Sequence, residues 1–508
     1  MRLVTSVKIL LVGLLFGSLP LYSITIVGPE EDLQAVLNSG EDLALKKGAV
    51  YEVTSTLRYT KEGQRIFTHG ANYPSEYATL RIADRALMMM IDGSGVPGTI
   101  LERVICDGNR YQMSVVPKPS IGGGGQPAMV HFGSKNGDNQ VIRNCVFMAT
   151  RTWSTLKMHE FASNMTVEDN IFLGAGVGPR GNGREFNEMP FGWADAISCA
   201  STDSVIRNNF IIDPTDVGIV LYGAPGTLVE NNLVATVSRE SLGGINLVDG
   251  FPFHAIKDKE NYFSYHGAVI RENLIDAFGA RIHMAIPVGA VVWVPHWAGR
   301  IYVGGEVLNN TISGGAGGYG IVAHGIEDWK ILGNVSTAKY SGIAEHRDHK
   351  NLPDDPAAYL FDQATVLNCE LQPEFEPVKH HIVHLLRTKG APEDENGYQM
   401  HDYGDAEIRA VVYAAYLEML GRDPHEVEYI KQADRLRSRH FNADGLRRSL
   451  MNSGEFRERF GNKFPGDLHP FRQQRWFDVC DALMRENGGM YSAIKLYKDA
   501  LKKLRIEK

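Results

Sequence analysis

The chain has 508 residues, and its formal net charge at pH 7 is −8, because 60 Asp and Glu residues outnumber 52 Lys and Arg residues. This length is too great for one compact core, and a mildly acidic chain without a basic stripe is not expected to bind nucleic acid. The 53 glycines indicate many tight turns. The five cysteines have no C-x-x-C spacing, so a zinc site is not expected.

The first 23 residues have the pattern of a secretory signal peptide. Arg2 and Lys8 precede a short apolar run at residues 9–16, and small residues follow it. An uncleaved anchor is the alternative. No later segment reaches the roughly 18 apolar residues that a membrane span needs. We therefore expect a protein without a membrane span once it is processed, which is secreted, periplasmic or held at the cell surface.

A short strand-like pattern recurs through the central part of the chain. It reads VIRNCVF, VEDNIFL, IRNNFII, VENNLVA, IRENLID, VLNNTIS and ILGNVST, which aligns the asparagines 144, 170, 209, 232, 273, 310 and 334. A second family of apolar strands, including DAISCA and VGIVLYG, accompanies it. Self-similarity with a period in the twenties predicts a solenoid, and stacked asparagine side chains can hydrogen-bond to one another.

These repeats resemble the right-handed parallel β-helix of the pectin-lyase-like superfamily over residues 24–370. The resemblance implies an all-β solenoid of about three short strands per coil. The stretch DLQAVLNSGEDLALKKG near its start looks like the capping segment of such helices.

Residues 371–404 are predicted to form a linker or a covering segment, and residues 405–508 a helical C-terminal module. The module resembles a small helical unit of unknown function that is often appended to secreted bacterial proteins. The matching residues are Tyr416, Leu420-Gly421-Arg422-Asp423-Pro424 and Ser453-Gly454-Glu455-Phe456. It could bind a glycan or a protein partner, or it could cap the solenoid.

Two aspartates stand just before apolar strands that lie one repeat apart. Asp195 precedes AISCA, and Asp216 precedes VGIVLYG. We therefore expect the two side chains on neighbouring coils, at the same end of their strands. Two close carboxylates disfavour double ionisation, which provides an acid beside a base, as glycoside hydrolysis requires.

The arrangement is similar to that of polygalacturonase-type glycoside hydrolases. Their four motifs, Asn-x-Asp-Gly, Gly-Asp-Asp, Gly-His-Gly and Arg-Ile-Lys, correspond to Trp193-Ala194-Asp195-Ala196, Thr215-Asp216-Val217, Ser241-Leu242-Gly243-Gly244 and Arg281-Ile282-His283. The similarity implies catalytic roles for Asp195 and Asp216, with Asp213 in place of the missing acid, and substrate binding by Arg281 and His283. The third motif lacks its histidine. Asp213-Pro214-Thr215-Asp216 is also similar to a motif of mannuronan epimerases, with Thr215 replacing a histidine.

Further candidates are weaker. Trp193, Tyr222, Trp293 and Trp297 could stack on sugar rings or simply pack. His159 with Glu160 lies on the coil before Asp195, and His254, His266 and Arg239 could hold substrate or be structural. No cofactor is expected, although Glu102, Asp107 and Asp169 could hold calcium.

From the sequence we therefore expect an exported, polysaccharide-active β-helix that cleaves glycosidic bonds. Asp216 is the expected general acid and Asp195 the expected base. A polysaccharide lyase or uronate epimerase, and a non-catalytic glycan-binding or surface protein, are the alternatives.

Overall fold

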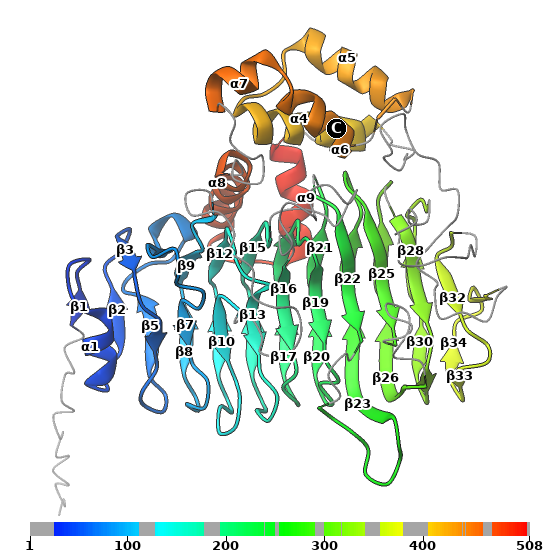
Figure 1. Ribbon diagram of the computed structural model, residues 1–508, viewed down its shortest axis with the longest axis horizontal. Helices are drawn as coiled ribbons and strands as arrows, with labels where there is room; N and C mark the ends of the chain where they lie inside the picture. Colours follow the sequence, from blue (N-terminus) through cyan, green and yellow to red (C-terminus); the bar gives the residue numbers. More distant parts are fainter. Residues whose placement is uncertain are drawn as a thin grey trace, which may run out of the picture.

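The computed structural model shows a solenoid of three long parallel sheets with helices packed along one side (Figure 1). It describes residues 25–110, 128–176, 194–237, 239–248, 253–289, 299–315, 317–340, 356–378, 405–438, 440–441, 443–460 and 470–504. The predicted signal peptide lies outside these residues. Strand pairing within each sheet is parallel throughout, which confirms the right-handed parallel β-helix predicted from the sequence.

Each complete coil contributes one strand to each sheet. Sheet A contains β1 (Ile26–Val27), β2 (Leu43–Leu45), β5 (Arg65–Thr68), β8 (Ile100–Glu102), β11 (Val141–Arg143), β14 (Thr166–Glu168), β17 (Val205–Arg207), β20 (Leu228–Glu230), β23 (Tyr262–Arg271), β26 (Ile301–Leu308), β29 (Ile326–Glu327), β30 (Lys330–Leu332), β33 (Val366–Leu367) and β34 (Glu370–Leu371). Sheet B contains β3 (Val50–Val53), β6 (Ala78–Ile82), β9 (Val104–Asp107), β12 (Val146–Met148), β15 (Ile171–Leu173), β18 (Phe210–Ile212), β21 (Leu233–Ala235), β24 (Leu274–Asp276), β27 (Thr311–Ser313) and β31 (Val335–Ser336). Sheet C contains β4 (Leu57–Arg58), β7 (Ile91–Asp92), β10 (Val130–Phe132), β13 (Ser154–Met158), β16 (Asp195–Cys199), β19 (Val217–Leu221), β22 (Ser241–Leu247), β25 (Ile282–Val288), β28 (Gly317–Ala323), β32 (Tyr359–Phe361) and β35 (Glu376–Pro377).

Apolar side chains stack in register through the inside of the solenoid. In sheet C, Leu156, Ile197, Ile219 and Ile245 are paired one above the other, and all four are fully buried. Such stacking gives one continuous core, because no single coil can bury its apolar face alone. The helix α1 (Leu33–Asn38), capped by Asp32, packs Leu33 and Leu37 into this core at the N-terminal end.

A buried asparagine ladder runs along the turn from sheet A to sheet B. The backbone N–H and the side-chain amide of Asn209 both donate to Oδ1 of Asn232, at 3.0 and 2.9 Å. Equivalent bonds continue from Asn170 to Asn334 and end on the Gln372 side chain. Each such side chain therefore satisfies backbone groups that the bend removes from the sheets.

The first predicted member of the ladder, Asn144, is wrong by one residue, because Cys145 occupies the ladder position on that coil. We call each ladder position a rung. Asn144 has φ 53°, the left-handed position that precedes each rung. Cys145 takes the inner place, where its N–H donates to Asn170 Oδ1 at 2.9 Å. A sequence alignment on asparagine alone could not separate the two positions, because both are rich in asparagine.

Alternating charges follow the outer face of sheet A. The in-register residues are Glu102, Arg143, Glu168, Arg207, Glu230 and Arg271. Salt bridges of 2.6–2.8 Å join them in pairs, from Glu102 to Arg143, Glu168 to Arg207 and Glu230 to Arg271. Exposed pairs contribute little stability individually, but like charges directly opposite one another would destabilise the pairing.

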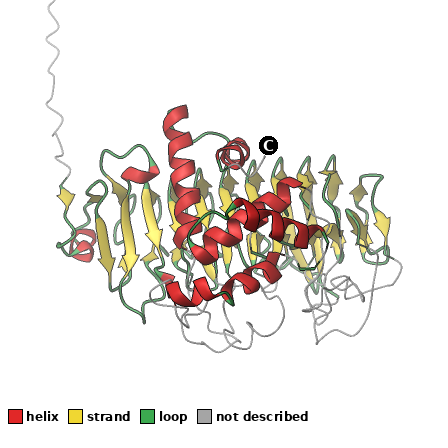
Figure 2. Cartoon of the chain, turned by 90° about the horizontal axis from the view of Figure 1, so that it is seen from above, coloured by secondary structure: helices red, strands yellow, loops and turns green. Residues whose placement is uncertain are grey.

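The C-terminal helices form two groups (Figures 1 and 2). The first group comprises α4 (Asp405–Leu420), α5 (Glu426–Arg437), α6 (Ala443–Met451) and α7 (Gly454–Phe460). It has its own small core, which includes Val412, Tyr416 and Phe456. The second group comprises α8 (Pro470–Asn487) and α9 (Ala493–Lys503).

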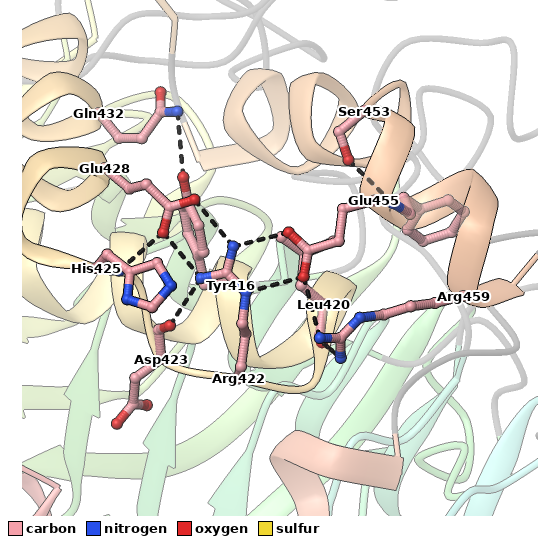
Figure 3. A network of polar contacts seen from close by, with 11 residues as sticks. Tyr416, Leu420, Arg422, Asp423, His425, Glu428, Gln432, Ser453, Glu455 and Arg459 are labelled. Carbon is pink, nitrogen blue, oxygen red and sulfur yellow. Dashed lines mark hydrogen bonds and ion pairs between the residues drawn. The ribbon is translucent and has the colours of Figure 1, made fainter.

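Several motif residues of the first group contact one another (Figure 3). Arg422, in the turn between α4 and α5, donates to Glu428 and to Glu455 at 2.7–2.9 Å. Its guanidinium also lies 5.4 Å from the centroid of the Tyr416 ring. Because Arg422 connects the first turn of α5 to α7, it fixes how three helices meet.

Helices α8 and α9 cover the outer face of sheet B. Trp476 and Tyr497 pack with Phe210 of β18, and Tyr497 donates from its hydroxyl to Asp276 Oδ2 at 2.9 Å. The outer side chains of sheet B, such as Ile171 and Leu233, belong to the same apolar cluster as these helices. The last part of the predicted 405–508 module is thus an integral wall of the solenoid and not only a cap at its end.

The solenoid also extends past the expected boundary at residue 370. Strand β34 pairs with β30, and β35 pairs with β32. The remainder of the predicted linker, residues 379–404, lies outside the described residues. Within the described part of the chain, no helix is long and apolar enough to cross a membrane.

Replacing Trp476 by Ala removes a 2 % exposed side chain from the contact between α8 and sheet B. We expect a loss of about 3–5 kcal/mol of stability, as for other buried aromatic truncations. Calorimetric unfolding of the full chain measures this loss. Gln474→Ala, an exposed position on the same helix, is the matched control, and equal unfolding temperatures for the two variants would contradict the packing.

Replacing Asn232 by Ala interrupts the middle of the ladder. The variant leaves the donors of Asn209 without their acceptor, so we expect a loss of about 2–4 kcal/mol in the unfolding free energy. Asn452→Ala, in the exposed turn before α7, should leave the unfolding temperature unchanged. A ladder variant as stable as the wild type would show that water replaces the lost bonds.

Candidate functional site

Strands β16, β19 and β22 of sheet C bend one residue after Asp195 and after the residues in register with it, Val217 and Gly243. Pairing skips Gly218 and Gly244, and a Cβ on either glycine would lie 2.6–2.7 Å from core side chains of Val234 and Ile275. Two successive residues, Gly218 and then Ile219, therefore face the core. Only glycine or another small residue fits this inward position. As a result, the residues on either side of the bend share the outer face of the sheet.

The outer side of this bend holds the Asp195 carboxyl. Ser198 donates from Oγ to Asp195 Oδ2 at 2.7 Å, and Ser198 Oγ also lies 2.8 Å from Ser154 Oγ on the previous coil. Asp195 is 2 % exposed. Burial and the neighbouring Asp216 carboxylate raise its pKa well above the usual range, against hydrogen bonds from Ser198 and the Val217 amide. Burial beside a like charge therefore favours the protonated form of this carboxyl.

Asp216 lies beside it on the next coil, at the same end of the strands. Its N–H donates to the Ala194 carbonyl at 3.1 Å, and its own carbonyl accepts from Leu242 and Gly243 N–H groups and from Ser241 Oγ. The backbone of Asp216 is thus held by the coils on both sides, whereas its side chain is partly exposed. The structure therefore brings together Asp195 and Asp216, as the repeat spacing predicts.

Asp213 has a different position. It has φ 52° and is fully buried. Its Oδ1 accepts from the backbone N–H groups of Val237 and Arg239 at 2.7 and 3.2 Å. These bonds join the turn before β19 to the next coil, so Asp213 serves the turn and does not replace a second catalytic acid beside Asp216.

Arg281 and His283 lie at the start of β25, two coils after Asp216, and both contact a residue that was not predicted from the sequence. Glu240 Oε1 is hydrogen-bonded to His283 Nε2 and lies 3.4 Å from Arg281 Nη1. Glu240 is 7 % exposed. Strand register places Leu242 between Asp216, on the coil before it, and His283, on the coil after it. The signal in the sequence was an acid directly before the third strand of the motif series, one residue ahead of Ser241.

Three other predicted residues lie at the opposite end of the sheet C strands. His159 and Tyr222 follow the last residues of β13 and β19, and His254 Nε2 lies 3.0 Å from the carbonyl oxygen of Ala200, just after β16. This end of the strands is about five residues, or about 16 Å, from the acid pair. His266 is on β23 in sheet A. Trp193, Trp293 and Trp297 lie outside the described residues.

His159 belongs to a polar cluster with His131 on β10. The His131 Nε2 accepts from the Ala128 N–H, and burial, followed by His159 and Lys157, lowers the pKa of His131 to about 3. His131 is therefore neutral, with its proton on Nδ1, which donates to His159 Nε2 at 2.6 Å. The other nitrogen of His159 lies 3.6 Å from Glu160, and this contact is the main reason why the pKa of Glu160 falls to about 2.

The three acids considered for calcium are each engaged elsewhere. Glu102 pairs with Arg143, Asp107 with Arg81, and Asp169 accepts from Asn208. Among the residues that the structure describes, no group of three or more metal-ligating side chains is close enough to hold an ion.

Comparisons with known proteins find similarity only in structure. No protein-family model and no curated protein matches the chain. Among solved structures, the A-module of the mannuronan C-5 epimerase AlgE4 from Azotobacter vinelandii matches with 13 % identity and a TM-score of 0.40, covering 70 % of this chain and 95 % of that one. The tailspike protein of E. coli bacteriophage HK620 matches with 11 % identity and a TM-score of 0.44, covering 70 % of this chain and 62 % of that one. The exopolygalacturonase from Thermotoga maritima matches with 12 % identity and a TM-score of 0.40, covering 69 % of this chain and 87 % of that one. Sequence identities and TM-scores this low say nothing about the chemistry of the site.

The raised pKa of Asp195 makes the stability of the protein depend on pH. An aspartate titrates near 3.9 in the unfolded chain and higher in the folded one, so the folded state binds more protons and stability falls as pH rises between these two values. Asp195→Asn removes this loss. We expect the variant to unfold at a higher temperature than the wild type at pH 7, and the difference to disappear below about pH 4.

Thermal unfolding between pH 3.5 and 8 measures this difference. Asp258→Asn, at an exposed loop position, is the control and should follow the wild type at every pH. A constant difference across the pH range would mean that Asp195 is already ionised in the folded protein.

Proposed function

We propose that this protein acts on a polysaccharide and cleaves its glycosidic bonds by acid/base catalysis at Asp195 and Asp216. The observation that supports this proposal is the pair itself. Asp195 is a buried carboxyl with a raised pKa, and it adjoins a second, partly exposed carboxyl on the next coil. Environments that separate the protonation states of two neighbouring carboxyls are what glycosidic cleavage requires.

The difference in burial between the two groups supports a role for each. Asp195, whose protonated form is favoured by burial, is suited to protonate the leaving oxygen, while Asp216 is suited to act as the base or nucleophile. This exchanges the roles expected from the sequence, because the sequence cannot show which acid is buried. Ser198 fixes the orientation of Asp195, and Ser154 in turn contacts Ser198. We propose export to the cell exterior together with this function, on the basis of the signal-like first 23 residues.

A lyase or epimerase acting on uronates is the second candidate. One observation favours it: Glu240 contacts His283 and lies beside Arg281. A histidine oriented by a carboxylate can remove a proton, and an arginine can neutralise a uronate.

Two readouts separate hydrolysis from elimination on a panel of soluble polysaccharides. Hydrolysis releases reducing ends without ultraviolet absorbance, and elimination produces both. We expect Asp195→Asn and Asp216→Asn each to lower the rate at least about 100-fold, as the loss of an essential acid or base does. Asp258→Asn is the control. Full activity in the Asp195→Ala, Asp216→Ala double variant would overturn the site, and a wild type without either product favours a uronate epimerase or a glycan-binding protein over a hydrolase or a lyase.

A further inference from the structure

A row of polar side chains crosses the outer face of sheet C and leads to the acid pair. Strand register places Asp92 of β7, His131 of β10, Lys157 of β13 and Ser198 of β16 side by side on four successive coils. Ser198 is the residue that donates to Asp195. Neighbouring strands lie about 4.8 Å apart, so Lys157 is about one coil from the Ser198–Asp195 hydrogen bond.

Lys157 differs from the other members of this row, because its ammonium group forms no hydrogen bond or salt bridge with a described residue. Asp92 pairs with Arg58, and His131 is neutral and bound to His159. Within the described residues, no carboxylate or hydrogen-bond acceptor contacts the Lys157 ammonium. Its nitrogen lies 5.6 Å from the centroid of the Trp153 ring.

The surroundings of Lys157 make an unpaired charge costly. The side chain is partly buried, and this burial lowers its pKa, with only the more distant Glu160 acting in the opposite direction. An anion that reached Lys157 would form a charge-assisted hydrogen bond in a partly dry site. The exposed Lys330, by contrast, pairs with Glu306 at 3.5 Å.

We propose that Lys157 binds an acidic substituent, a carboxylate or a sulfate, of the sugar chain that reaches Asp195 and Asp216. The inference rests on the proposed function and specifies its substrate class, an anionic polysaccharide. Lys157 acts as a positioning residue: it holds an acidic sugar one coil from the reacting bond and takes no part in proton transfer.

The test measures binding of the full chain to a carboxylated polymer, to the neutral form of that polymer, and to a sulfated polymer. Polygalacturonate supplies carboxylates, its carboxyl-reduced form is the neutral match, and carrageenan supplies sulfates. Affinity electrophoresis gives the dissociation constant of the wild type, Lys157→Met, Lys157→Arg and the control Lys330→Met, with circular dichroism to verify folding. We expect the wild type to bind an acidic polymer and not the neutral one, and Lys157→Met to bind about tenfold more weakly. Lys157→Arg and Lys330→Met should stay close to the wild type.

The two acidic polymers show which substituent is recognised. If the wild type cleaves or binds neutral polysaccharides as well as acidic ones, or if Lys157→Met binds like the wild type, the anion site is wrong and the proposed function stands. If the wild type binds and cleaves no polymer of the larger panel, the proposed function fails, and the anion site fails with it.

Discussion

In-register stacking of successive coils is the constraint on which every other feature of this protein depends. Because each strand pairs with its equivalents on the coils before and after it, any residue type that recurs in the sequence becomes a row in space. The row of Leu156, Ile197 and Ile219 forms part of the core, and the asparagine row holds the turn between sheets A and B. The charged row on sheet A follows the same rule.

The candidate site is a local departure from that rule. At the bend in sheet C, Gly218 and Gly244 turn inward beside residues that also face inward. The outer side of the bend then brings Asp195 and Ser198 within hydrogen-bond distance, although they are three residues apart. In a flat strand these two side chains would point to opposite faces. The small residues of the bend are therefore as necessary to the acid site as the acids themselves.

Sequence reasoning succeeded where a feature follows from the repeat alone. The spacing of the second strand family was enough to place Asp195 and Asp216 on adjacent coils, and the apolar strands were enough to predict a β-helix. It failed where tertiary contacts decide. Nothing local distinguishes Asn144 from Cys145 as the first rung, or Asp213 as a turn acceptor from a catalytic acid. Glu240 was missed because its partners Arg281 and His283 are a whole coil away. The sequence predicted helices in the C-terminal module, but it did not show that the outer face of sheet B is the packing partner of α8 and α9.

The proposed chemistry depends on Asp195, whose protonated form is favoured because the carboxyl is buried beside Asp216. An isotope-edited infrared titration of the aspartate carboxyl bands, taken as the difference between wild type and Asp195→Asn, gives the pKa of Asp195 directly. We predict a pKa well above the usual range in the wild type and a clearly lower one in Asp216→Asn, where the like charge is gone. A pKa near 3.9 in the wild type, or one that does not change when Asp216 is replaced, would contradict it.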